Sequence, residues 1–80
     1  GAMAANGKVG LMMNVPKTRL DAVMKVLPAG MRPTIAELSD KDWVDLTVII
    51  EEQLVRKLAP DLKKAGAEDI VEYPLNKIIH

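Results

Sequence analysis

Few side chains in this sequence are suited to covalent chemistry. The 80 residues include no cysteine, one histidine, His80, and only two aromatic residues, Trp43 and Tyr73. These counts leave no material for a thiolate metal site, a disulfide framework or a histidine cluster. An acyl-phosphate hydrolase would need a phosphate-cradling loop with an arginine after its first strand, where this chain has Asn14 followed by Val-Pro. We therefore expect no catalytic residues and no metal ligands.

The charge balance excludes several classes of partner. Lys plus Arg number 11, and so do Asp plus Glu, so no field of one sign attracts nucleic acid or an anionic membrane. RNA-recognition domains also need aromatic residues on a sheet face, and this chain is poor in them. No apolar run approaches the ~20 residues that span a bilayer. We expect no nucleic-acid partner, no membrane partner and a cytoplasmic location, which the absence of cysteine also fits.

A candidate binding surface follows from the alternation of residues 43–50. One side of this strand carries four aliphatic residues, and the other side carries Trp43, Asp45, Thr47 and Ile49. Together with Met12 and Asn14 of the first strand, the second set combines apolar area with a few polar groups. Such a surface suits either a small-molecule site or a subunit interface. The pattern alone favours the interface, because an uncovered half-apolar sheet is more often buried by a neighbouring subunit.

Strands and helices alternate in the first half of the chain. Residues 8–15 are continuously apolar up to Pro16 and predict a strand. Residues 17–27 predict a helix that begins with a capping box formed by Thr18 and Asp21. A short strand at 34–38 and the strand at 43–50 flank the polar run 39–42, which is typical of a hairpin with a four-residue loop.

The second half repeats this order. A helix is expected from Glu51 to about residue 65, with a kink at Pro60, and Gly66 marks its end. Residues 70–73 predict a fourth strand, and the apolar tail 74–79 is expected to pack back on the body.

The order strand, helix, strand, strand, helix, strand predicts an α+β domain of the ferredoxin-like βαββαβ class. Its four-stranded antiparallel sheet would carry both helices on one face and leave the other face open. Residues 1–6 are typical of a tag remnant with a disordered start, and residues 7–80 would form the domain.

Several short strings, taken together and in order, resemble one known family. The strings are 11–16 (LMMNVP), Leu20-Asp21, Leu27-Pro28, 32–35 (RPTI), Trp43-Val44, 66–70 (GAEDI) and 74–79 (PLNKII). On these strings the chain resembles, over about residues 8–79, the C-terminal regulatory domain of long-form ATP phosphoribosyltransferase, the first enzyme of histidine biosynthesis.

The resemblance implies an allosteric domain that binds L-histidine, the end product of the pathway, and causes feedback inhibition. The catalytic domains would lie earlier in the same chain and would use magnesium, whereas this domain would hold no cofactor and would not be an enzyme. The resemblance also implies a homo-oligomer, a trimer or a hexamer-related assembly. Carried over by position, the histidine site would comprise Asn14, Gly30, Met31, Thr34, Ile49 and Asp69.

Two functions remain open on these grounds. In the first, the open sheet face binds histidine, with Asn14 and Thr34 fixing the polar ends of the amino acid while Met31 and Ile49 supply apolar wall. In the second, the domain is an oligomerisation module whose open face packs against other subunits and binds no small molecule.

Overall fold

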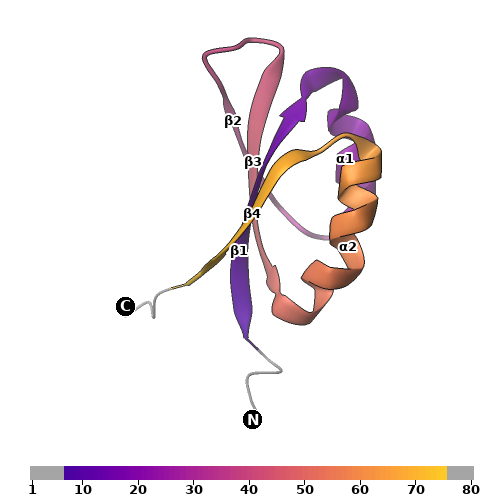
Figure 1. The fold of residues 1–80 in the computed structure, drawn as a ribbon, viewed down its shortest axis with the longest axis vertical. Coiled ribbons are helices and arrows are strands. Elements are labelled where there is room, and N and C mark those ends of the chain that lie inside the picture. Colours follow the sequence, from indigo (N-terminus) through magenta and orange to yellow (C-terminus); the bar gives the residue numbers. More distant parts are fainter. Residues whose placement is uncertain (1–6, 76–80) are drawn as a thin grey trace.

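The continuously apolar segment near the start of the chain forms a central strand of the sheet. A computed structural model describes residues 7–75, and in it β1 (Lys8–Pro16) pairs with β3 on one side and β4 on the other. Alternate residues of β1, Val9, Leu11, Met13 and Val15, are buried. They face the two helices, as Figure 1 shows for the helical layer on one side of the sheet.

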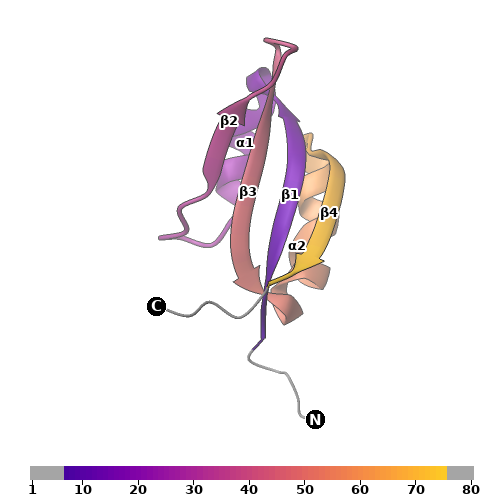
Figure 2. The same cartoon turned by 90° about the vertical axis from the view of Figure 1, so that its left-hand side faces the viewer.

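The complete sheet has the order β2-β3-β1-β4 and is antiparallel throughout (Figure 2). The chain passes through β1, a short 3₁₀ turn, α1, β2, β3, α2 and β4. This order confirms the predicted ferredoxin-like α+β fold with both helices on one face. The opposite face carries no element of the described chain, so the strands present one uncovered surface.

The hairpin of β2 (Thr34–Glu37) and β3 (Trp43–Glu51) is close to its predicted position. Its loop spans residues 38–42, one residue more than predicted, because β2 ends before Leu38. Asp40 organises the loop: its side chain accepts a hydrogen bond from the backbone N–H of Asp42 at 3.0 Å, and its carbonyl accepts one from Trp43 at 3.1 Å.

The first helix does not begin as predicted. A 3₁₀ turn, η1 (Lys17–Arg19), precedes α1 (Leu20–Val26), and no side-chain cap is present, so the prediction of a Thr18–Asp21 capping box is wrong. The backbone N–H of Lys17 is instead bonded to the carbonyl of Asp42 at 2.8 Å. This tie to the hairpin loop starts the turn directly after β1.

The second helix, α2 (Glu52–Ala65), runs through Pro60 without ending there. It ends at Gly66, whose φ is +121°, and the backbone N–H groups of Gly66 and Ala67 bond the Leu62 carbonyl at 3.2 and 2.9 Å. Arg19 lies against this end, because a β-carbon on Gly66 would stand 2.9 Å from the Arg19 β-carbon.

The core is wholly apolar and lies between the sheet and the helices. It includes Leu46 and Val23, both fully buried, and Leu62 of α2. No polar or charged residue in the described range is buried. None of the helices in residues 7–75 is long and apolar enough to cross a bilayer.

The last strand is longer than predicted and irregular. β4 spans Glu68–Pro74 rather than residues 70–73, and two of its residues stand opposite one residue of β1 between Met12 and Asn14. This bulge contains Asp69, which has a φ of +53°. The predicted tag remnant, residues 1–6, and most of the predicted apolar tail, residues 76–79, lie outside the described residues.

Candidate functional site

Strand register places the predicted surface residues on the open face. Thr34, Thr47, Met12 and Val71 form one row across all four strands, and Ala36, Asp45 and Asn14 form the next. Several apolar side chains on this face meet solvent: Met12 is 38% exposed, Ile49 50% and Val71 52%. The face is therefore mixed in character, as the alternation of β3 indicated.

A pocket of about 540 Å³ lies where β2 stops covering β3. β2 pairs with β3 only as far as Thr47, so the rest of β3 is bordered by the loop 27–33 instead of a strand. The pocket extends from this loop over Ile49 to Tyr73 of β4. Its volume falls within the range of small-molecule sites, roughly 300–1,000 Å³. The lining residues are Lys8, Ala29, Gly30, Met31, Arg32, Thr34, Thr47, Val48, Ile49 and Tyr73.

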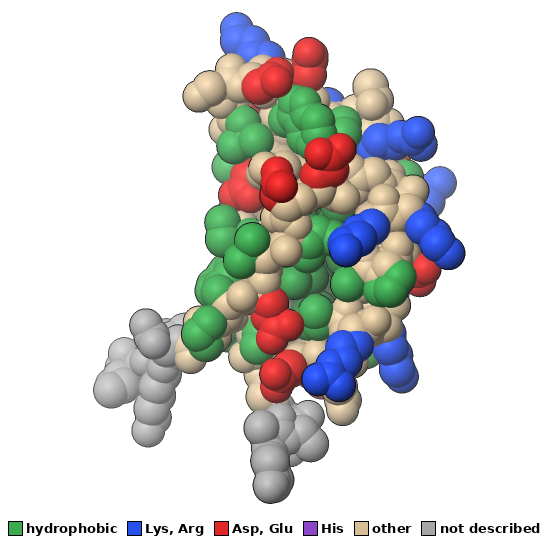
Figure 3. All heavy atoms as spheres, viewed as in Figure 1, with side chains coloured by type: hydrophobic (Ala, Val, Ile, Leu, Met, Phe, Trp, Pro, Cys, Tyr) green, Lys and Arg blue, Asp and Glu red, His purple; other side chains and the backbone are tan. Residues whose placement is uncertain are grey.

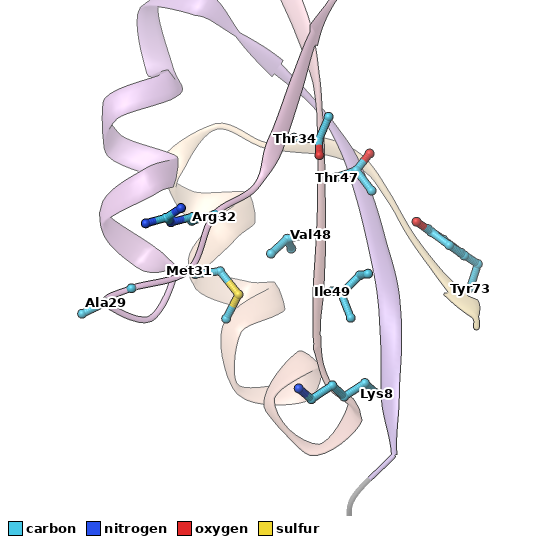
Figure 4. A pocket seen from close by; sticks show the side chains of 10 residues that line it. Lys8, Ala29, Met31, Arg32, Thr34, Thr47, Val48, Ile49 and Tyr73 are labelled. Atoms are coloured by element: carbon cyan, nitrogen blue, oxygen red, sulfur yellow. The ribbon is translucent and has the colours of Figure 1, made fainter. Parts of the chain in front are cut away.

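The arrangement of the lining side chains is visible in Figure 4. Thr34 and Thr47 lie together at one end, Lys8 lies at the other, and Met31 and Tyr73 approach from opposite sides of Ile49. Both charged residues of the lining, Lys8 and Arg32, are cations, and no acidic residue lines the pocket. Arg32 points away from Ile49. The charged side chains that line the pocket are therefore all positive.

The polar side chains of the pocket are not paired with one another. Within residues 7–75, Lys8, Arg32, Thr34, Thr47 and Tyr73 make no side-chain hydrogen bond and no salt bridge. No buried side-chain nitrogen or oxygen atom in that range lacks a partner, so these unpaired groups are open to solvent. Each of them is free to bond a ligand.

Four of the six predicted site residues line this pocket: Gly30, Met31, Thr34 and Ile49. Gly30 has a φ of +85°, a backbone angle that glycine adopts more readily than other residues do. The other two, Asn14 and Asp69, lie beyond the lining.

Asn14 and Asp69 form a separate polar pair on the same face. The side-chain amide of Asn14 donates a hydrogen bond to an Asp69 carboxylate oxygen at 3.2 Å. Asp45 is the partner of Asn14 on β3, so two carboxylates flank the amide. Met12 is the β1 partner of Thr47 and therefore marks the near end of the pocket. Asn14 follows Met12 by two residues of the same strand, a distance of roughly 7 Å. A ligand of amino-acid length could reach from one group to the other.

The carry-over by position did not identify Lys8, Arg32, Thr47 and Tyr73 as site residues. Thr47 had been placed on the open face by strand alternation but was not assigned to the site. Lys8 and Tyr73 come from opposite ends of β1 and β4, and only the strand order brings them to the same pocket. One available signal was Gly10, a glycine inside an apolar strand, which often marks the close approach of another group.

Charge is divided between the two layers of the molecule. Figure 3 shows Lys and Arg side chains gathered along the helical side, with Asp and Glu side chains more toward the strands. The basic residues of η1, α1 and α2 are Lys17, Arg19, Lys25, Arg56, Lys57, Lys63 and Lys64.

In residues 7–75, no group of three or more His, Cys, Asp or Glu side chains is arranged to hold a metal ion.

Comparison with known proteins identifies the family. A family model described as "HisG, C-terminal domain" matches residues 5–77. The chain belongs to this family. The finding confirms the resemblance drawn from the short strings.

Curated relatives extend the match for the HisG C-terminal domain. The chain is 57% identical over 79 residues to an ATP phosphoribosyltransferase of Desulforudis audaxviator and 56% identical to one of Pelotomaculum thermopropionicum. It is 58% identical to one of Solibacter usitatus. In each case the match covers 99% of this chain but only 27% of the relative. The chain thus spans about a quarter of the length of these relatives.

Proposed function

We propose that this HisG C-terminal domain is the effector-binding part of an ATP phosphoribosyltransferase and that its pocket binds L-histidine. The observation that carries the proposal is a pocket beside the part of β3 that β2 leaves unpaired, whose polar side chains are all unpaired within residues 7–75. The family membership and the relatives' printed name support the choice of enzyme.

The pocket has a suitable group for each part of the ligand. The hydroxyls of Thr34 and Thr47 would donate hydrogen bonds to the α-carboxylate, at the end of the pocket nearer to Asn14. Ile49 and Met31 supply apolar wall for the side chain. The acidic groups beside Asn14 would attract the ligand's ammonium from about two strand residues away.

In this proposal the domain regulates and does not catalyse. Histidine binding would lower the activity of catalytic domains elsewhere in the same chain, where magnesium and the substrates would bind, and the assembly would work in the cytoplasm. Regulation requires that histidine bind one conformation of the enzyme more tightly than another. The pocket is built from a loop and all four strands, so a shift of the loop 27–33 would alter it.

Calorimetric titration of the chain with L-histidine tests the proposal. Thr34→Val removes one pocket hydroxyl with little change of shape, and we expect the dissociation constant to rise about 3- to 10-fold. Thr18→Val is the matched control, because Thr18 is an exposed threonine of η1 that does not line the pocket. Equal affinity in both variants and the wild type would rule out Thr34 as a contact.

Inhibition of the complete enzyme by histidine tests regulation, with Asn14→Ala added to the two threonine variants. Thr34→Val or Asn14→Ala should raise the histidine concentration needed for half-inhibition, whereas Thr18→Val should leave it unchanged. Unchanged inhibition in both site variants would exclude this pocket as the effector site.

The second candidate, an oligomerisation module without a ligand, is favoured by the exposed apolar side chains of the open face. It predicts a melting temperature that excess histidine does not change. A ligand that binds only the native state raises that temperature by mass action. Thermal unfolding with and without histidine therefore discriminates between the two candidates.

A further inference from the structure

The side-chain ring of Tyr73, a residue of β4, lies over the backbone of the neighbouring strand β1. Gly10 is its partner on β1, and a β-carbon built on Gly10 would stand 2.0 Å from Cζ of the Tyr73 ring. The three atoms nearest to that position all belong to the phenolic end of the ring. The ring therefore rests directly on the β1 backbone, in space that any other residue at position 10 would fill. A glycine covered by a cross-strand aromatic ring is a known stabilising arrangement in sheets.

This placement carries the Tyr73 hydroxyl from the edge strand toward β3. Gly10 is also the partner of Ile49 on β3, so the phenolic end approaches the strand that forms the pocket floor. Figure 4 shows the hydroxyl turned toward Ile49 and Thr47. Within residues 7–75 the hydroxyl has no hydrogen-bond partner, and it is not among buried unsatisfied atoms. It is thus an unused polar group that points into the pocket.

We infer that Tyr73, seated on Gly10, is a specificity-determining residue of the pocket. Its hydroxyl bonds a polar atom of the ligand's side chain and selects an amino acid with a ring nitrogen over one with an apolar ring. The inference rests on the proposed function, since it names the group that distinguishes histidine from similar amino acids. A site with a hydrogen-bonding group of this kind discriminates strongly, because an apolar ligand leaves that group unpaired.

A purely structural role for Tyr73 makes a different prediction. If the ring served only to cover Gly10, phenylalanine would replace it without effect, because the ring and its seat are unchanged. If the hydroxyl binds the ligand, phenylalanine preserves the fold and weakens histidine binding. The Tyr73→Phe variant therefore separates the two roles.

The experiment is a calorimetric titration of wild type and Tyr73→Phe with L-histidine, and a competition titration with L-phenylalanine. We expect Tyr73→Phe to weaken histidine binding about 3- to 10-fold, to leave phenylalanine binding equal or tighter, and to keep the melting temperature. Wild-type histidine affinity in this variant would overturn the inference. Equal losses for histidine and phenylalanine would overturn it as well.

A double-mutant cycle tests the contact between the Tyr73 ring and Gly10. Gly10→Ala must displace the Tyr73 ring, so it should weaken histidine binding at least as much as Tyr73→Phe. In a Tyr73→Leu background the phenolic atoms are gone, and Gly10→Ala should then have little additional effect on binding. Equal effects of Gly10→Ala in both backgrounds would show that the glycine acts independently of Tyr73.

Failure of this inference is distinguishable from failure of the proposed function. If wild type binds histidine and Tyr73→Phe binds it equally well, only the role of Tyr73 is wrong. If wild type does not bind histidine at all, the proposed function is contradicted and this inference falls with it.

Discussion

The two faces of the sheet are formed by the same strands but differ in what their side chains contact. The covered face is aliphatic, and its residues, such as Leu11, Leu46 and Val48, are almost completely buried beneath the helices. The open face mixes Met12 and Ile49 with hydroxyl, amide and carboxylate groups that meet solvent. Adjacent residues of one strand lie on opposite faces of the sheet. A substitution on the covered face can therefore change stability without changing binding, and one on the open face can change binding without changing stability.

The largest expected difference concerns neighbouring positions of β3. Leu46→Ala removes a fully buried side chain and should lower the free energy of unfolding by about 3–4 kcal/mol. Ile49→Ala removes a half-exposed side chain from the other face and should lower it by less than ~1 kcal/mol. Urea unfolding followed by circular dichroism measures both. Similar losses would mean that the open face is buried by another subunit.

Self-association tests the open face directly. We expect the chain to form a homo-oligomer, a trimer or a hexamer-related assembly, because Met12, Ile49 and Val71 leave apolar sheet uncovered in a small domain. Val71→Asp should weaken association by about 2–3 kcal/mol, since it buries a charge in that contact. Sedimentation equilibrium measures the change.

Ile35→Asp provides the matched control for the other face. Ile35 is 42% exposed, close to the 52% of Val71, but it is the β2 partner of Leu46 and so lies on the side of the helices. It should leave association unchanged. A wild-type monomer at high concentration, or equal effects of the two aspartates, would exclude the open face as the contact.

Two glycines with positive φ extend the comparison to the loops. Gly66→Ala should lower the free energy of unfolding by about 2 kcal/mol, because it combines an unfavourable backbone angle with contact against Arg19. Gly30→Ala meets nothing within 4 Å and should lower it by only about 1 kcal/mol, the backbone part alone. Thermal and chemical unfolding of both variants give the difference.

The Arg19→Gly background isolates the contact. There, the β-carbon of Gly66→Ala meets no side-chain atom at position 19, and its effect should approach that of Gly30→Ala. An unchanged effect of Gly66→Ala in this background would show that only the backbone angle matters at the end of α2.

The fold could be predicted from the sequence because its patterns are local and agree with one another. Alternation in β3 identified the buried residues Val44, Leu46, Val48 and Ile50. The start of α1 could not be predicted, because the tie between Lys17 and the Asp42 carbonyl joins residues far apart in the chain. The second helix, α2, continues past Pro60, because proline removes one backbone hydrogen bond without preventing helical geometry in the residues around it.

The site was predictable only in part for a related reason. Gly30, Met31, Thr34 and Ile49 were placed by resemblance and do line one pocket. The bulge in β4 adds one residue, and one residue reverses which face each later side chain meets. The position of Tyr73 over Gly10 therefore depends on an irregularity that alternation alone does not reveal.

The smallest expected effect concerns the bulge itself. Asp69 has a φ of +53° and accepts an exposed hydrogen bond from Asn14. Asp69→Gly relieves the unfavourable backbone angle but loses that bond, and we expect a net change within about 1 kcal/mol, toward higher stability. Asn14→Ala removes the bond and keeps the backbone, so it should lower the free energy of unfolding by roughly 0.5 kcal/mol.

Two substitutions of Asp69, by glycine and by asparagine, separate backbone strain from ligand binding. If the carboxylate of Asp69 attracts the ammonium of a ligand, Asp69→Gly should weaken histidine binding although it stabilises the fold. Asp69→Asn keeps a residue that tolerates this backbone angle and removes only the charge, so it should weaken binding without stabilising the fold. Calorimetric titration and urea unfolding of both variants provide the measurements. Histidine binding that both variants leave unchanged would confine the ligand to the pocket beside Ile49 and leave the Asn14–Asp69 pair a structural feature of the bulge.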